Sequence, residues 1–210
     1  MKRVSSRGEP LDRVWDLLDA RRFGEALAAL DKILAAEPDD AAAIDLKGIC
    51  FLRQEQNAKA EASFRTALEH LPASAPIYVH LGEALARQNR QDEALAAYEC
   101  AVRYDDTYAP GFYCRGRMRM FHLRDAEGSL QDLLKAVELD PNTSESWFTL
   151  GLCRLGRQEA EAADADFKRA LALDPVLEPR VWAALKDYIS AAEPPVRPRD
   201  TSIRVIYRTT

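Results

Sequence analysis

Glycine recurs along this 210-residue chain at a nearly constant interval, and that interval constrains the fold more than any other feature of the sequence. Successive members of the series are 34, 34 and 35 residues apart, at Gly48, Gly82, Gly116 and Gly151. A series of alanines has intervals of 34, 35 and 34 residues, at Ala67, Ala101, Ala136 and Ala170. Two series with one period indicate repeats of about 34 residues. One such repeat cannot bury its own apolar face, so stability must come from stacking.

Composition indicates that each repeat is made of helices. Alanine, leucine, glutamate and arginine are frequent, only 9 residues are glycine, and β-branched residues are sparse. Unbranched side chains lose little rotamer freedom in a helix, so this usage favours helix over strand. Prolines near the ends of several repeats, at Pro72, Pro141 and Pro175, would stop a second helix there. The sequence therefore predicts an all-α chain of helix pairs.

One repeat is longer than the others by a single residue. The distance from the glycine to the alanine of a repeat is 19 residues in three cases, but 20 residues from Gly116 to Ala136. The extra residue therefore falls inside the fourth repeat, and it leaves open where the first helix of that repeat ends.

The repeated motif resembles the signature of the tetratricopeptide repeat (TPR) family. The fit is clearest in the last repeat, where WFTLG at residues 147–151 is followed by Ala163, Phe167 and Pro175. The resemblance implies a right-handed α-solenoid of about five TPR helix-turn-helix units with a C-terminal cap helix. These repeats would span residues 7–40, 41–74, 75–108, 109–143 and 144–177.

Two repeats depart from the motif at its glycine or at the alanine of the second helix. The first has Val14 in the place of the glycine, and the fourth has Ser129 in the place of an alanine of the second helix. In the regular repeats the glycine is expected to let helices approach closely, because a Cβ would push the backbones apart. Aromatic residues are expected to fill the wider gap that remains, at Phe64, Tyr98 and Phe167.

Three segments lie outside the array of residues 7–177. Residues 1–6 are expected to be a flexible N-terminus, and residues 178–192 a helix that caps the apolar end of the array. Its apolar stripe is Val181, Leu185 and Tyr188, widened by Trp182 and Ile189. Residues 193–210 are rich in proline and arginine and predict an extended tail. That tail is either disordered or a peptide that joins a partner's sheet edge or lies in the TPR groove.

The TPR resemblance also implies where a partner binds. In the family the first helices of the repeats line a concave surface, and fixed positions of each first helix point into it. Transferred to this sequence, the partner-binding positions are Ile49, Arg53, Val79, Glu83, Arg87, Tyr113, Arg117, Met120, Phe148 and Leu152. Aromatic side chains would anchor an extended or helical segment, and arginines would pair with its carboxylates. Alternatively, some of these residues pack between neighbouring helices.

The predicted function is protein binding, as an adaptor or scaffold that holds a peptide segment of a partner protein in the concave groove. Two alternatives stay open: a chaperone that shields hydrophobic segments of a client, and a fixed structural subunit of a larger assembly. One TPR subtype binds chaperone tails through a clamp of lysine, asparagine and arginine. The corresponding positions here are mostly Asp45, Leu46, Ile49, Pro76 and His80, so that activity is not expected.

Composition argues against several other classes of partner. The net charge is −5 with both signs interleaved, so no basic face for nucleic acid is expected. No apolar run reaches the roughly 18 residues needed to span a bilayer, and the N-terminal charges precede no apolar signal core. The four cysteines show no disulfide or zinc spacing, which favours small buried side chains in a cytoplasmic protein.

No catalytic site, metal site or cofactor is expected. His70, His80 and His122 fall in different repeats, and no pair has the spacing of metal ligands. No glycine-rich phosphate loop occurs, because the glycines serve helix packing at long intervals. The chain is therefore predicted not to be an enzyme.

Overall fold

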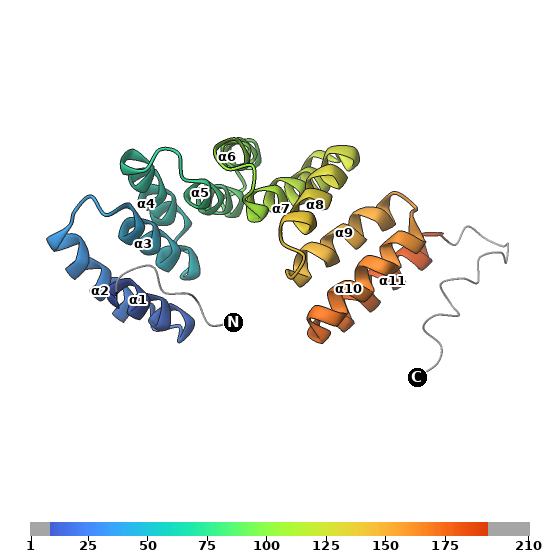
Figure 1. Cartoon of the computed structure of the whole chain (residues 1–210), viewed down its shortest axis with the longest axis horizontal. Coiled ribbons are helices and arrows are strands. Elements are labelled where there is room, and N and C mark those ends of the chain that lie inside the picture. Colours follow the sequence, from blue (N-terminus) through green and yellow to red (C-terminus); the bar gives the residue numbers. More distant parts are fainter. Residues whose placement is uncertain (1–8, 193–210) are drawn as a thin grey trace. The chain divides into compact units, whose positions relative to one another are not determined.

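The computed structural model of the chain describes residues 9–192, with the side chains of residues 10–188 (Figure 1). Within those residues eleven α-helices follow one another and no strand occurs, which confirms the all-α prediction. The predicted flexible segment 1–6 and the predicted tail 193–210 lie outside the described residues. The chain forms two compact units, one ending at Arg115 and one beginning at Gly116, and each is described by itself.

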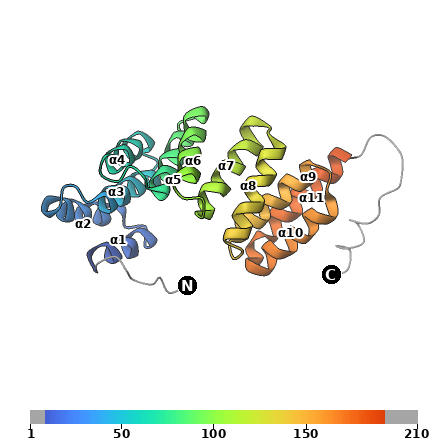
Figure 2. The same ribbon diagram turned by 45° about the horizontal axis from the view of Figure 1, so that its top comes forward.

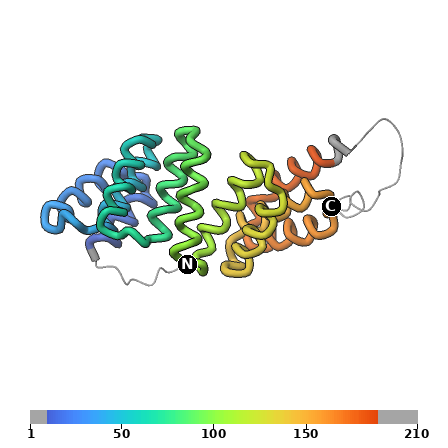
Figure 3. Tube along the Cα trace, turned by 90° about the horizontal axis from the view of Figure 1, so that it is seen from above, coloured from blue at the N-terminus to red at the C-terminus, as the bar shows by residue number. Residues whose placement is uncertain are grey.

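The N-terminal unit is a series of helices in which each packs against the one before it, from α1 through α6. Figure 3 traces these helices as antiparallel runs. The first helices of successive repeats also contact one another, α1 with α3 and α3 with α5. The bounds are α1 (Glu9–Asp19), α2 (Phe23–Ala36), α3 (Ala41–Arg53), α4 (Asn57–His70), α5 (Ala75–Arg87), α6 (Gln91–Tyr104) and, crossing into the next unit, α7 (Ala109–Met118).

Within the C-terminal unit, helices also pack against their neighbours in the chain. Contacts join α8 to α9, α9 to α10 and α9 to α11, and Figure 2 shows the last three helices packed together. Val181 and Leu185 of α11 are buried in one core cluster with Phe167 of α10, so α11 covers the end of that core. The elements are a π-helical turn η1 (Arg119–Leu123), α8 (Ala126–Leu139), α9 (Ser144–Gly156), α10 (Ala160–Leu173), a 3-10 turn η2 (Pro175–Leu177) and α11 (Glu178–Ala192).

The turn inside each repeat uses one residue in the left-handed region of backbone space. These residues have φ between 54° and 65° and are Arg21, Glu55, Asn89, Arg124 and Gln158. In four of the five repeats the next residue donates its N–H to a carbonyl five positions back, as Gln56 does to Phe51 at 2.9 Å. This bond closes the first helix and reverses the chain into the second helix.

A buried ring lies directly on the glycine in three repeats. A Cβ added to Gly82 would stand 2.5 Å from Cε1 of Tyr98, and Gly48 and Gly151 face Phe64 and Phe167 in the same way. The Tyr98 side chain is only 1% exposed. The sequence interpretation gave the glycine a close backbone approach and the ring a separate gap. In the structure the ring itself occupies the space left by the missing Cβ, so the two residues form one contact.

The extra residue of the fourth repeat lies in the π-helical turn. The distance from the glycine to the left-handed residue is 7 residues from Gly48 to Glu55, but 8 residues from Gly116 to Arg124. The turn η1 fills this stretch, and the N–H of Asp125 bonds to a carbonyl six positions back, that of Arg119, at 3.1 Å. A π-helical turn accommodates one added residue without breaking the helix.

Two buried carboxylates within the C-terminal unit form ion pairs with partly exposed arginines. Arg154 Nη1 of α9 lies 2.8 Å from Asp166 of α10, and Arg119 Nη1 of η1 lies 2.8 Å from Asp132 of α8. Burial raises the pKa of Asp166 to about 6, while Arg154 acts in the opposite direction. A single acidic residue beside the core forms no recognisable sequence motif, so these ion pairs could not be predicted from the sequence.

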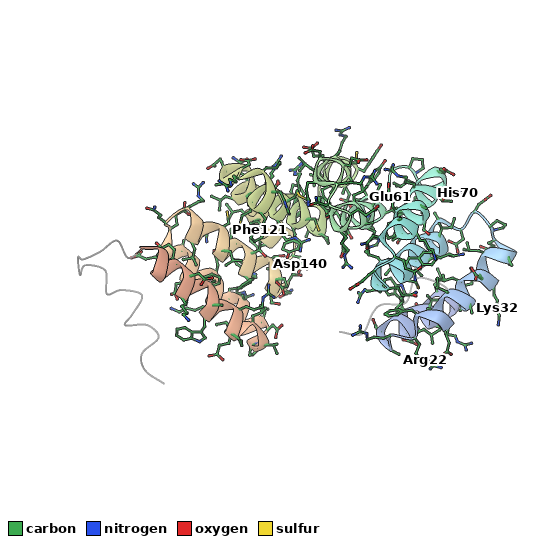
Figure 4. The ribbon with its side chains drawn as sticks, turned by 180° about the vertical axis from the view of Figure 1, so that it is seen from behind. Arg22, Lys32, Glu61, His70, Phe121 and Asp140 are labelled. Carbon is green, nitrogen blue, oxygen red and sulfur yellow. The ribbon has the colours of Figure 1, made fainter. Side chains whose placement is uncertain are left out.

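A charged cluster joins the second repeat to the third. Glu61 of α4 has a side chain only 13% exposed and is labelled in Figure 4. It accepts hydrogen bonds from Gln88 at 2.9 Å, Arg65 at 3.0 Å and Arg90 at 2.6 Å. Burial alone would raise the pKa of Glu61, but these three donors lower it below its ordinary value.

We expect Gly82→Ala to lower the free energy of unfolding by about 1–3 kcal/mol, because the added carbon collides with the buried ring of Tyr98. Urea denaturation followed by circular dichroism measures the change. Gly24→Ala in α2 is the matched control, since nothing lies within 4 Å of the added carbon there. Alanine should stabilise that helix by about 0.5–1 kcal/mol. Equal losses in the two variants would contradict the contact described above.

We expect Glu61→Gln to cost about 1–2 kcal/mol at about pH 7. A carboxylate with a lowered folded-state pKa stabilises the fold above its unfolded pKa of about 4, and this contribution is lost as the pH falls through the folded pKa. The difference from the parent protein should therefore shrink at about pH 3 in urea titrations. Glu25→Gln, which breaks an exposed pair with Arg22, should change stability by less than about 0.5 kcal/mol. A loss at Glu61 that is independent of pH would contradict this assignment.

Candidate protein-binding surface

Contacts between residues 35 positions apart hold the first helices of successive repeats beside one another in the N-terminal unit. His80 Nδ1 of α5 lies 2.8 Å from Asp45 Oδ1 of α3. Further along the same two helices, Arg87 Nη1 donates to the carbonyl oxygen of Leu52 at 3.1 Å. These two bonds join α5 to α3 at two points along the helices.

The surface of α3 and α5 contains five of the predicted binding residues. Ile49 and Val79 are each only 7% exposed, so their side chains pack between helices. Arg53 and Arg87 are exposed, and Glu83 is half-buried. Arg87 Nη2 also pairs with Glu83 at 2.6 Å, which leaves Arg53 as an exposed guanidinium that pairs with no other described residue. The solvent-exposed side chains among these five residues are therefore charged rather than apolar.

The Asp45–His80 pair was not recognised in the sequence. Both side chains are mostly buried, with 14% and 25% of their surface exposed. The His80 ring also packs on Phe64, with the ring centroids 5.6 Å apart. The pair therefore connects the first-helix surface to the buried ring of the second repeat. Two residues 35 apart give no local motif, and only the repeat period could have suggested the pair.

In the C-terminal unit α11 covers the predicted aromatic anchor. Phe148 of α9 is only 4% exposed and belongs to the core cluster. The guanidinium of Arg180 lies 4.4 Å from the centre of the Phe148 ring, and Arg180 also pairs with Glu145. Phe148 is therefore a core residue in this conformation, while Leu152 is partly buried at the edge of the same cluster.

The remaining predicted residues lie on or after α7, to either side of the boundary between the units. Tyr113 is half-buried and belongs to the N-terminal unit, whereas Arg117 and Met120 belong to the C-terminal unit. Arg117 is exposed and Met120 is half-buried. The ten predicted positions therefore form no single surface that can be described across both units. Their role in binding stays a prediction.

The described residues offer little for other chemistry. No group of three or more His, Cys, Asp or Glu side chains in that part of the chain could hold a metal ion. All four cysteines are free thiols; Cys50 and Cys153 are buried, whereas Cys100 and Cys114 are partly exposed. Burial raises the pKa of Cys50 to about 11, so it is a poor nucleophile. No helix within residues 9–192 is long and apolar enough to cross a membrane.

The repeats match a known protein family. The family model for the tetratricopeptide repeat matches residues 11–75, 46–109 and 117–178, which is more than half of the chain. The chain belongs to the tetratricopeptide repeat family. Among solved structures, a thermophilic TPR protein of Thermus thermophilus superposes with a TM-score of 0.72 and 23% identity, covering 84% of this chain and 97% of that one. MamA superposes with a TM-score of 0.62 and 21% identity, covering 76% of this chain and 93% of that one.

Curated relatives match this TPR chain over only a small part of their own length. The human protein O-mannosyl-transferase TMTC3 is 25% identical over 175 residues, covering 76% of this chain and 19% of the relative. The human mitochondrial import receptor subunit TOM70 is 24% identical over 156 residues, covering 71% of this chain and 26% of the relative. The chain therefore spans about a quarter or less of the length of these relatives.

We expect Phe148→Ala to lower the free energy of unfolding of the TPR array by about 3–5 kcal/mol, because the ring is buried in the core cluster. The matched control is Trp182→Ala on α11, whose side chain is 43% exposed. Substitutions at exposed positions usually change stability by about 0.5 kcal/mol or less. Chemical denaturation of both variants provides the comparison. A loss at Phe148 as small as that at Trp182 would mean that the ring is an open anchor.

Proposed function

We propose that the protein is an adaptor or scaffold that binds a peptide segment of a partner protein along the first helices of its repeats. The observation that carries this proposal is the charged surface of α3 and α5. Arg53 and Arg87 are exposed there, on two helices fixed by the Asp45–His80 pair and by the bond from Arg87 to Leu52. A surface held in place before binding loses little freedom when a partner arrives.

Arginine is well suited to the recognition step on this surface. The planar guanidinium binds a carboxylate through two parallel hydrogen bonds, which fixes direction as well as position. Arg53 is the better placed of the two, because Arg87 already bonds to Glu83. In this proposal Arg53 makes the first contact with a carboxylate of the partner. Glu83 and Arg87 then determine the register of the bound segment along the helices. In the C-terminal unit Arg117, Met120 and Leu152 would contribute a mixed basic and apolar surface.

Similar proteins support protein binding as the class of function. The structure of YrrB is described as a TPR protein with an unusual peptide-binding site, and it is 19% identical with a TM-score of 0.57. The first TPR domain of Spaghetti (RPAP3) was solved with the HSP90 peptide SRMEEVD, at 21% identity and a TM-score of 0.53. At this identity the likeness establishes the fold alone, and the transfer of peptide binding belongs to the proposal.

We propose no catalytic activity for this chain. Two of the relatives are named as transferases, TMTC3 and the tomato SPINDLY protein, but the matched regions cover only 19% and 10% of their lengths. The free thiols of all four cysteines further support a reducing compartment, such as the cytoplasm, for the proposed adaptor.

Exposed apolar residues favour one alternative, a chaperone that shields hydrophobic segments of a client. Phe121 is 58% exposed and Leu123 is 44% exposed, both within η1. Large exposed apolar side chains that lie together commonly mark a contact site. A chaperone would keep its client soluble on co-expression, whereas an adaptor would form a reversible complex that weakens with salt.

We expect Arg53→Glu to weaken binding of the partner by about tenfold or more, because it places a carboxylate where the partner presents one. A photo-crosslinking residue in place of Arg53 first identifies the partner, and titration calorimetry then measures its affinity for each variant. Arg103→Glu, on the second helix α6, makes the same charge change at another exposed position and should leave the affinity unchanged. Equal losses in both variants would show a general charge effect and remove support for this surface.

A further inference from the structure

The segment around η1 has a charge opposite to that of the whole chain. Residues 107–124 contain four arginines and no acid, although the net charge of the chain is −5. Three of the arginines, Arg117, Arg119 and Arg124, lie after the unit boundary, together with His122. A local excess of one sign attracts the opposite charge at short range even when the whole molecule does not.

The π-helical turn also brings apolar side chains to the surface. In the second and fifth repeats, the residue three positions before the left-handed turn residue is a leucine buried in the core. Leu52 is 4% exposed and Leu155 is 5% exposed. The equivalent residue in the fourth repeat is Phe121, which is 58% exposed. Leu123, two residues further along η1, is 44% exposed. In the repeat with the added residue, this position therefore exposes an aromatic side chain to solvent, whereas the other two repeats bury a leucine there. Figure 4 labels Phe121 on the segment between α7 and α8.

The acidic groups next to this segment are already engaged. Asp132 and Asp125 lie 2.8 Å and 3.7 Å from Arg119, and Asp125 also accepts a hydrogen bond from the N–H of Gly128. Glu127 pairs with Arg157 at 3.0 Å. Arg124 is exposed and forms no ion pair with another described residue. The positive charge that remains available therefore lies beside Phe121 and Leu123.

We infer that the η1 surface, formed by Arg117, Met120, Phe121, Leu123 and Arg124, binds an acidic amphipathic segment of a protein partner. This inference rests on the proposed function and specifies the chemistry of its ligand. Apolar side chains of the segment cover Phe121 and Leu123, and its carboxylates pair with Arg124. A long polyanion such as nucleic acid fits less well, because the chain around this small basic surface is acidic overall.

The probe is a fluorescein-labelled synthetic 16-residue helix, with leucine and phenylalanine along one face and glutamate elsewhere, as in amphipathic ligands. Fluorescence anisotropy measures its binding to the full chain. The test variants are the double substitution Phe121→Ala with Leu123→Ala, and the single substitution Arg124→Glu. Their controls are Trp182→Ala, which removes another exposed aromatic side chain, and Arg169→Glu on α10, which makes the same charge change elsewhere. Circular dichroism establishes that every variant keeps its helices.

The expected result is binding that weakens with added salt and falls by about tenfold or more in both test variants but not in the controls. A peptide with lysine in place of glutamate should not bind. Any of these results would overturn the inference: no binding of the acidic peptide, equal binding of the lysine peptide, equal affinity of test and control variants, or stronger binding of single-stranded DNA or of phosphatidylserine vesicles. Loss of the natural partner in Arg53→Glu but not in the η1 variants would refute the η1 site and leave the proposed function intact.

Discussion

The contact between a helix glycine and a buried ring is the interaction on which the rest of the structure depends. In three repeats the ring of Phe64, Tyr98 or Phe167 fills the space beside a glycine of the partner helix. These side chains are at most 1% exposed, so each hairpin contains its own packing centre. Because this contact lies between the two helices of a repeat, the far side of each first helix is not needed to hold the hairpin together. That side can carry polar residues and contact a partner.

Polar contacts between successive first helices act on this same surface. The bonds from His80 to Asp45 and from Arg87 to Leu52 join residues 35 positions apart in the N-terminal unit. They stiffen the surface that we propose binds a peptide, and they leave Arg53 exposed beside them. The fold and the proposed function are thus connected by single side chains: the residues that align the helices also determine which charges remain available.

The repeat period allowed the helix pairs and their packing residues to be predicted from the sequence, because glycine and alanine at fixed intervals of about 34 residues are typical of stacked helix pairs. The accessible surface could not be predicted equally well. A residue's position in the repeat predicts the direction in which its side chain points, but not whether a neighbouring helix covers that side chain. Phe148 is covered by Arg180 of α11, and Ile49 lies between helices. Counting also located the extra residue in the fourth repeat, whereas its π-helical form and the exposure of Phe121 required the structure.

The fourth repeat shows that the glycine can face another side chain. An added Cβ at Gly116 would lie 3.0 Å from Cβ of Asp132 and 3.1 Å from Cγ of Leu133, and the buried Asp132 carboxylate pairs with Arg119 of η1. A double-mutant cycle of Gly82→Ala and Tyr98→Leu therefore tests most directly whether the ring is what requires the glycine. We expect the cost of Gly82→Ala in urea unfolding to fall by about 1 kcal/mol or more when leucine replaces Tyr98. The same cost in both backgrounds would contradict it.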